Sequence, residues 1–227
     1  MYNKINSVHK YNNVYVRGEG LCKMSIVDRK KQEREVLKNK ILDAASNIIT
    51  SEGFEKLSIR KIADAIEYSP AIIYNYFKDK AEIVSYIISD NSCKIIHILK
   101  KIQFDEQNPD NTLREGLNEY IKFVLENPEL YRAVIMSNTV IMNEKISMMH
   151  KGVAEEKQTM NYIKKIIVLG VEKEIFEQGD GELLAQIIWA STFGLLSRII
   201  IEKQLSEEQK ARLVQAHIDF MIKGLKK

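Results

Sequence analysis

Apolar residues recur at helical spacing from about Asp28 to the end of the chain, and this periodicity limits the possible folds more than any other feature. No segment sustains the alternation of apolar and polar residues that is typical of a strand, and the 227 residues include only three prolines. We therefore expect an all-α fold. The first apolar stripe consists of Val36, Ile41, Leu42, Ala45, Ile48 and Ile49.

Breaks between the apolar runs predict where the helices begin and end. Gly53 follows the first run at a position that favours a left-handed C-terminal cap. Ser58 supplies a hydroxyl N-cap for a second helix, and Ser69 with Pro70 does so for a short third helix over 70–77. The later breaks predict helices over 80–101, 112–126, 128–137, 149–174, 182–203 and 206–225.

Composition excludes several classes of protein. A hydrophobic share of 45% is ordinary for a globular chain, so disorder is not the dominant state. Cys22 and Cys93 cannot make a disulfide scaffold, and no Cys/His cluster has metal-binding spacing, so we expect no metal and no cofactor. The longest uncharged apolar stretch, 183–197, is shorter than the roughly 20 residues of a membrane span. With no secretory signal either, we expect a cytoplasmic protein without membrane contact.

Motifs of the common catalytic sites do not occur in the sequence. The patterns GxSxG, GxxxxGK, GxGxxG and HExxH are absent, and the four histidines are scattered. The adjacent carboxylates Glu155-Glu156 and Glu207-Glu208 point to different helix faces. We therefore assign no catalytic residue and do not expect an enzyme.

Residues 1–27 differ from the rest, since they carry few strong apolar residues and no helical period. We expect a disordered or poorly ordered tail, and Met24 is a candidate translation start because a regular segment follows it. The net charge is +3 over residues 1–23, +3 over 24–101 and −3 over 102–227. A basic N-terminal part followed by an acidic C-terminal part allows contact with a polyanion at the N-terminal end.

Three helices within residues 28–82, with few residues between the second and the third, predict a helix-turn-helix DNA-binding domain. In this motif a short helix with a small, polar N-terminus enters the major groove, and neighbouring helix N-termini hold phosphates. Ser69, Pro70 and Ala71 are small enough for such an approach. Tyr74, Tyr76 and Lys80 are polar groups spaced to reach a DNA backbone.

The run GFEKLSIRKIADAIEYSPAIIYNYFKDKAEI, with Ile41-Leu42-Asp43-Ala44-Ala45 before it, closely resembles the TetR family of transcriptional regulators. The resemblance is strong over roughly residues 36–84. One departure is that Glu67 and Tyr68 stand where the family pattern has a turn glycine and a small aliphatic residue. A positive φ at Glu67 would cost on the order of 1 kcal/mol.

The resemblance implies roles for particular residues. Ser58 meets a phosphate, and Arg60 contacts a base or a phosphate with a fork that suits guanine. The start of the third helix lines the groove, and polar groups after it hold phosphates and fix register. The basic run 29–34 stays open between a solvated helix start and flanking DNA contacts. The implied DNA-binding residues are Ser58, Arg60, Ser69, Pro70, Ala71, Ile72, Tyr74, Tyr76 and Lys80.

Residues 83–227 resemble the C-terminal helices of the same family, which implies a helical effector-binding and dimerisation domain. The helices near 182–203 and 206–225 would pair with their copies in a homodimer, and 182–201 is apolar almost all round. Such a C₂ dimer fits a pseudo-palindromic operator. Candidate ligand contacts, for which core filling is the alternative, are Tyr120, Phe123, Tyr131, Met160 and Trp189.

The predicted function is a homodimeric repressor of transcription that an unknown small-molecule effector releases from double-stranded DNA. Two alternatives stay open at this point. One is a family member that acts constitutively or answers to a protein partner. The other is an all-α module or enzyme that retains the helix-turn-helix as scaffold.

Overall fold

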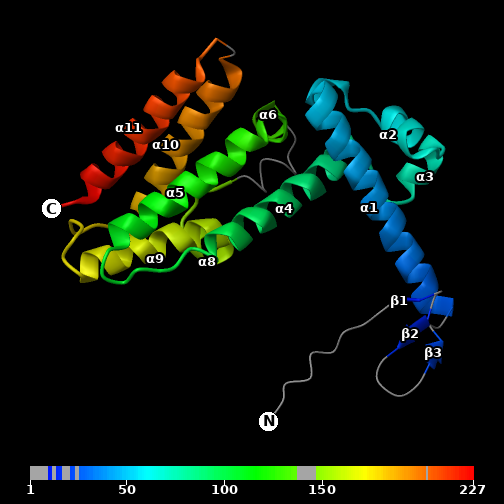
Figure 1. Cartoon of the computed structure of the whole chain (residues 1–227), viewed down its shortest axis with the longest axis horizontal. Helices are drawn as coiled ribbons and strands as arrows, with labels where there is room; N and C mark the ends of the chain where they lie inside the picture. The colour runs from blue at the N-terminus through cyan, green and yellow to red at the C-terminus, as the bar shows by residue number, and fades with distance from the viewer. Residues whose placement is uncertain (1–9, 12–13, 17–20, 24–25, 137–146, 203) are drawn as a thin grey trace.

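The computed structural model describes residues 10–11, 14–16, 21–23, 26–136, 147–202 and 204–227. Helices dominate the described chain, and the predicted all-α class is confirmed (Figure 1). They are α1 (Ile26–Glu52), α2 (Ile59–Ile66), α3 (Pro70–Tyr74), α4 (Lys80–Leu99), α5 (Pro109–Glu126), α6 (Pro128–Met136), α8 (Val153–Glu156), α9 (Gln158–Glu172), α10 (Gly181–Ile201) and α11 (Glu207–Leu225). A single 3₁₀ turn, Phe54–Lys56, follows α1.

Three short strands precede α1, and the sequence analysis missed them. They are β1 (Lys10–Tyr11), β2 (Val14–Val16) and β3 (Leu21–Lys23), paired antiparallel in the order β1-β2-β3 with Tyr15 opposite Cys22. The sequence Val-Tyr-Val of β2 is β-branched and aromatic, which favours extended backbone. The rest of the predicted tail, and Met24, lie outside the described residues.

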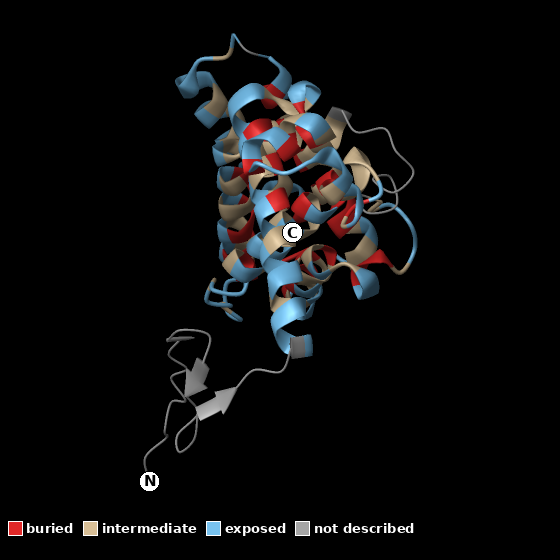
Figure 2. Ribbon diagram, turned by 90° about the vertical axis from the view of Figure 1, so that its right-hand side faces the viewer, coloured by how far each residue is buried: buried red, intermediate tan, exposed pale blue. Residues whose placement is uncertain are grey.

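Two buried clusters hold the helices together. The first unites α1–α4 with α6 around Ile41, Ile62, Ile73 and Phe77, all at most 1% exposed. The second unites α5 and α8–α11, and Figure 2 shows buried residues where the helices face one another. Helix α4 runs from the first cluster toward the second as one continuous helix. The domain boundary predicted between residues 82 and 83 therefore stays a prediction.

Helix ends follow the capping chemistry in most places. Ser58 Oγ accepts the Lys61 backbone N–H at 3.2 Å, as predicted. Gly53 follows α1 with a positive φ of 93°, but its ψ of 157° lies outside the left-handed helical region, so the predicted left-handed cap was wrong. Ser69 stands at the N-cap of α3 with Pro70 at its first position, but the Ser69 hydroxyl makes no capping hydrogen bond, so that detail was wrong. The third helix ends at Tyr74 because the next backbone N–H groups bond three residues back, tightening the turn.

Two further expectations are corrected. Val36 is 61% exposed, since it faces the open space between α1 and α3 and not the buried first cluster. The helix predicted over 149–174 is divided at Lys157 into α8 and α9. The Glu182 carboxylate accepts the backbone N–H groups of Gly152 and Ala154 and so caps the start of α8, and Lys157 ends this turn in an extended conformation (φ −110°, ψ 114°).

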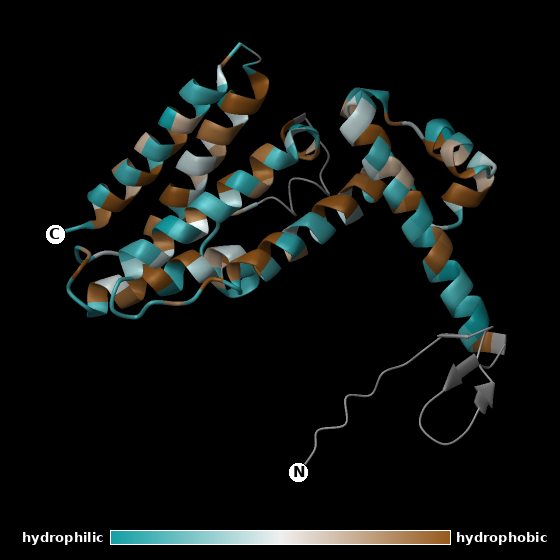
Figure 3. Cartoon of the chain, in the orientation of Figure 1, coloured by the Kyte–Doolittle hydropathy of each residue, from teal (hydrophilic) through white to brown (hydrophobic). Residues whose placement is uncertain are grey.

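Helix α10 is the one described helix that is long and apolar enough to cross a membrane by length and composition alone. It packs against α9, and 39% of its most apolar window is buried in the fold. Figure 3 shows the hydrophobic residues along α10 beside the more hydrophilic α11. Part of this apolar surface therefore stays uncovered in the single chain.

Candidate functional site

A tight turn at Glu67 fixes the angle between α2 and α3. Glu67 has φ 62° and ψ 41°, in the left-handed region that glycine usually occupies. Its N–H bonds to the Asp64 carbonyl at 3.3 Å, and the Tyr68 N–H bonds to the Ala63 carbonyl at 3.0 Å. These two bonds form a Schellman cap, so the turn keeps the glycine geometry with a glutamate in place.

Helix α3 is anchored on one side and open on the other. Ile73 and Phe77 are buried in the first cluster, at 0% and 1% exposure. Ile72 is half-buried. The residues Ser69, Pro70, Ala71, Tyr74 and Asn75 are exposed, and Tyr74 is 58% exposed. We call these exposed residues together with Ile72 the α3 surface, and it contains every residue predicted to enter the groove.

The residues predicted to contact phosphates differ in whether their polar groups already make hydrogen bonds within the protein. Arg60 is exposed on α2, and Ser58 is exposed although its oxygen already accepts the Lys61 N–H. Lys80 is engaged inside the domain, because its Nζ donates to the Phe54 carbonyl at 3.1 Å and lies 4.2 Å from the Phe54 ring centre. Burial lowers the pKa of Lys80. Two of its three ammonium protons remain for another acceptor.

A basic groove lies between the N-terminal half of α1 and α3. The Arg34 guanidinium sits 5.6 Å from the centre of the half-buried Tyr76 ring, and Lys40 sits 5.4 Å from the Tyr68 ring. The basic run of α1 therefore lies beside the α3 surface, a position that the sequence alone did not indicate. The groove is lined by Arg29, Lys30, Gln32, Glu33, Arg34, Val36, Leu37, Lys40, Tyr68, Ile72, Asn75 and Tyr76.

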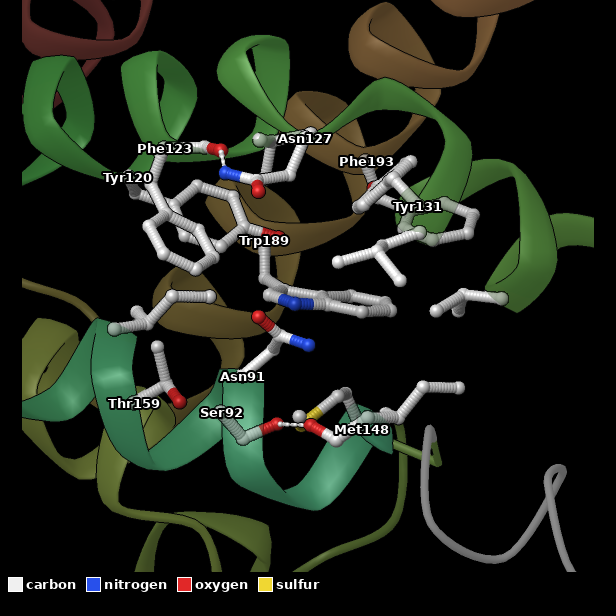
Figure 4. Close-up of a pocket in the computed structure, with 15 residues that line it drawn as sticks. Asn91, Ser92, Tyr120, Phe123, Asn127, Tyr131, Met148, Thr159, Trp189 and Phe193 are labelled. Carbon is white, nitrogen blue, oxygen red and sulfur yellow. Dashed lines mark hydrogen bonds between the residues drawn. The ribbon is translucent and has the colours of Figure 1, made fainter. Parts of the chain in front are cut away.

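A second site, which we call the chamber, is a cavity of about 130 Å³ between α4, α5, α6 and α10 (Figure 4). Four of the predicted ligand contacts line it. Met160 does not, since it is fully buried in the second cluster, and we leave it out of the site. The lining residues are Ile88, Asn91, Ser92, Ile95, Tyr120, Phe123, Val124, Asn127, Leu130, Tyr131, Val134, Met148, Thr159, Trp189 and Phe193.

Stacked rings form one wall of the chamber. The Trp189 and Phe193 rings lie 5.1 Å apart at 20°, and the Tyr131 ring lies 5.4 Å from Phe193. Figure 4 shows Trp189 in the middle of the lining, between Asn91 from α4 and the residues of α5. None of the described lining residues is charged. Phe193 and the α4 lining residues were not predicted from the sequence, because these segments have the same apolar and amide pattern as any packed helix.

The polar groups of the chamber are neutral. Asn127 and Asn91 each donate an amide proton to a backbone carbonyl, of Phe123 and of Ile87, at 2.8 Å. Burial raises the pKa of Tyr120 to about 12 and raises that of Tyr131 still further. Both phenols are therefore uncharged near neutral pH. Within the described residues no cluster of three or more His, Cys, Asp or Glu side chains could hold a metal.

Two side chains connect the chamber to the first cluster. Ile88 of α4 and Leu130 of α6 both line the chamber and pack against the first cluster. Both side chains are therefore shared between the chamber and the cluster that includes residues of α2 and α3.

The uncovered face of α10 and α11 is the last feature. On α10, Leu183 and Ile187 are 53% and 50% exposed, and a Cβ placed on Gly194 would meet open space. On α11, Phe220 is 70% exposed and Gly224 is similarly open. An apolar stripe with small residues on two adjacent helices is typical of a helix-packing interface.

Comparison with known proteins places these features among regulators. Residues 41–87 match the family model described as bacterial regulatory proteins, tetR family. An HTH-type transcriptional regulator of Staphylococcus aureus (strain bovine RF122 / ET3-1) is 24% identical over 101 residues, which are 44% of this chain and 55% of that regulator. The chain thus spans about half the length of this curated relative.

Solved structures agree over most of the chain. A TetR transcription regulator from Haloarcula marismortui has a TM-score of 0.69 at 16% identity, covering 85% of this chain and all of that one. RolR, crystallised with its ligand resorcinol, has a TM-score of 0.63 at 14% identity, covering 86% of this chain and 90% of that one. At such identities the likeness demonstrates the fold.

Proposed function

We propose that this chain, which belongs to the TetR family of bacterial regulatory proteins through its residues 41–87, is a homodimeric, cytoplasmic repressor that a small molecule releases from its operator. Residues 28–82 form the DNA-binding domain, and residues 83–227 bind the effector and a second copy. The observation that carries the proposal is the α3 surface, because a short helix anchored by Ile73 and Phe77 presents its small N-terminal residues outward.

The α3 surface enters the major groove. Ser69, Pro70, Ala71 and Ile72 approach the base edges, and the exposed Tyr74 reaches a phosphate. Tyr76 holds a second phosphate beside Arg34. Ser58 meets a phosphate from the start of α2, and Arg60 contacts a base or a phosphate with a guanidinium fork that can read a guanine. Lys80 contributes with the protons that the Phe54 carbonyl leaves unused.

Dimer formation through α10 and α11 sets the spacing of two α3 surfaces. The exposed Leu183, Ile187 and Phe220 would be covered by the same helices of a second copy. Isologous contact of this kind gives C₂ symmetry. The operator would then be pseudo-palindromic, with half-sites about one helical turn apart.

Release would act through the residues shared between the chamber and the first cluster. An effector in the chamber displaces Ile88 on α4 and Leu130 on α6, and α4 carries the shift to the DNA-binding domain. A coupling of roughly 1–3 kcal/mol changes operator occupancy by a factor of about 5 to 150. The fold neighbour RolR, crystallised with its ligand resorcinol, supports a small-molecule ligand for a chain with this fold.

Selection of genomic fragments by the purified protein at near-physiological salt tests the proposal. We expect the recovered fragments to share an inverted repeat with half-sites about one helical turn apart. Recovery of fragments with no common site, by protein that mass spectrometry shows to be free of any bound small molecule, would refute sequence-specific binding.

A further inference from the structure

Helix α6 belongs to both buried clusters. Ala133 is buried in the first cluster and Leu130 packs against it, whereas Tyr131 packs against the second cluster. The Tyr131 ring also lies 5.4 Å from the ring of Phe193 on α10. As a whole, α6 contacts α1 and the 3₁₀ turn and also contacts α10. One short helix therefore connects the DNA-binding part of the chain to a helix that we propose for dimer formation.

Arg132 fastens α6 to the C-terminal end of α10. Its Nη2 donates to the Ile200 backbone carbonyl at 2.8 Å, and its Nε lies 3.3 Å from each carboxylate oxygen of Glu129. Carbonyls in the last turn of a helix have no partner within the helix, and the negative end of the helix dipole favours a cation there. The Arg132 side chain is only 17% exposed, so water weakens these contacts less than at the surface.

Glu129 extends the connection to the DNA-binding part. A Cβ placed on Gly53 would lie 3.9 Å from a Glu129 carboxylate oxygen, so this carboxylate lies beside the turn that follows α1. That turn leads through the 3₁₀ helix to Ser58, the N-cap of α2. Contacts thus run from the Ile200 carbonyl through Arg132 and Glu129 to the chain segment that positions α2.

The type of contact determines which residue fixes the angle of α6. Apolar packing, such as that of Tyr131 on Phe193, has no preferred direction. A guanidinium is a rigid, planar fork, and with a carbonyl and a carboxylate as its two acceptors it permits one orientation. Arg132 is therefore the residue that holds α6 at one angle to α10.

We propose that α6 is a strut that fixes the orientation of the DNA-binding domain relative to α10, with Arg132 as its positioning residue. The inference rests on the proposed function, because in a homodimer joined through α10 and α11 this orientation sets the distance between the two α3 surfaces. A fixed distance makes the half-site spacing part of what the protein recognises. Arg132 contributes to this specificity without contacting DNA.

Two DNA duplexes test the effect on recognition. One is the operator selected by the wild-type protein, and the other has one base pair inserted between the half-sites, which turns them by roughly a tenth of a helical turn. Fluorescence anisotropy at near-physiological salt gives the ratio of the two affinities. We expect Arg132→Gln to reduce the wild-type preference for the uninterrupted operator by a factor of about 5 or more. Its affinity for a single half-site should stay unchanged, because the α3 surface is intact.

Arg114→Gln is the matched control. Arg114 of α5 pairs with Asp219 of α11, so the substitution also removes an arginine contact between two helices, but both helices belong to the second cluster. It should keep the wild-type ratio. Arg132→Lys is a second test variant in case Arg132→Gln lowers the temperature of thermal unfolding. Lysine keeps the charge without the fork, so we expect it to reduce the spacing preference in the same direction.

A distance measurement within one chain tests the strut without DNA. Spin labels on cysteines placed at the exposed Asp64 of α2 and Lys165 of α9 report how the two clusters are oriented, since α9 packs against α10. The two native cysteines are replaced by serine, and an excess of unlabelled chains removes distances between subunits. Pulsed electron paramagnetic resonance should show a broader distance distribution in Arg132→Gln than in the wild-type protein or in Arg114→Gln.

The outcomes separate this inference from the proposed function. An unchanged distance distribution or an unchanged spacing preference in both Arg132 variants, or an equal effect of Arg114→Gln, would overturn the inference. If the wild-type protein meanwhile binds its selected inverted repeat, the proposed function stands. If the distribution broadens only in the Arg132 variants and the wild-type protein selects no inverted repeat, the role of Arg132 in fixing the orientation stands and the proposed function fails.

Discussion

At the scale of single residues, Glu67 is the position where the chain departs from the easiest backbone. It adopts φ 62° to close the Schellman cap between α2 and α3. Replacing Glu67 with glycine should raise the free energy of unfolding by about 1 kcal/mol, because glycine enters the left-handed region without a Cβ clash. Urea unfolding of both proteins measures the difference.

The chain supplies a matched control for this substitution. Glu174 has φ 58°, and the bonds from its own N–H and from that of Ile175 close the same kind of cap after α9. Glu174→Gly should stabilise by a similar amount, whereas Glu67→Ala should not, since alanine keeps the clash. If Glu67→Ala raises the free energy of unfolding as much as Glu67→Gly does, the stabilisation comes from loss of the carboxylate and not from relief of the backbone clash.

Residue-level predictions from sequence succeeded where the chemistry is local. The Ser58 cap depends only on the three residues that follow it, and the pattern indicated it correctly. Met160 illustrates the limit, because it is as apolar as Trp189 and lies on an equally regular helix. Which of them faces a cavity depends on how α9 and α10 rotate against α5, and periodicity along one helix contains no information on that rotation.

At the scale of elements, Glu182 connects the start of α10 to α8. Its carboxylate accepts the Gly152 N–H at 2.7 Å and the Ala154 N–H at 3.2 Å, with Lys164 Nζ at 3.9 Å. The Gly152 hydrogen bond is the main cause that lowers the pKa of Glu182 below its ordinary 4.5. This stabilisation is therefore present above pH 4.5 and is lost as the pH falls through the lower, folded-state pKa.

Comparison with Glu182→Gln tests this contact. The wild-type protein should be more stable than the variant at pH 7, and the difference should shrink as the pH falls below 4.5. Thermal unfolding at a series of pH values measures it, with the exposed Glu172→Gln on α9 as the control. A difference that stays constant from neutral to acid pH would show that the carboxylate is not ionised in this contact.

The α1 groove makes a prediction about salt. If Arg34 of each subunit neutralises a phosphate beside α3, Arg34→Gln removes two phosphate contacts from the proposed dimer and should reduce the slope of log affinity against log salt by about 2. Lys31→Gln removes the same charge from an exposed position of α1 that does not line the groove, and it should leave the slope unchanged. Fluorescence anisotropy with operator DNA provides both slopes. Equal slopes for all three proteins would exclude Arg34 from the interface.

The elements themselves were largely predictable, and their exceptions have tertiary causes. Periodicity and capping residues indicated most of the described helices within a few residues, and they predicted α8 and α9 as one helix. The start of α8 at Val153 was not visible, because its cap comes from Glu182, which is 30 residues beyond Gly152 in the chain. The α4 residues that line the chamber were not predicted for a similar reason, because apolar residues of α4 pack against the first cluster and also line the chamber.

At the scale of the whole molecule, the proposed dimer depends on the exposed stripe on α10. Ile187→Glu changes a side chain that is 50% exposed in the single chain, so the fold should persist. In a dimer it places two carboxylates in an apolar interface, and we expect monomers in sedimentation at micromolar concentration. Val168→Glu on α9, 40% exposed and outside the stripe, is the control. An unchanged dimer would exclude this face.

The central claim is that the α3 surface reads DNA, and Ala71→Asp tests it most directly. Ala71 is exposed beside Pro70, so the substitution should leave the thermal stability and the oligomeric state unchanged. The introduced carboxylate would lie at the floor of the DNA major groove, where it faces the electronegative base edges and the phosphates of the operator. Such a like-charge contact costs several kcal/mol. The affinity for the selected operator, measured by fluorescence anisotropy at near-physiological salt, should fall by about a hundredfold or more. An affinity equal to that of the wild-type protein would contradict the assignment of α3 as the recognition helix.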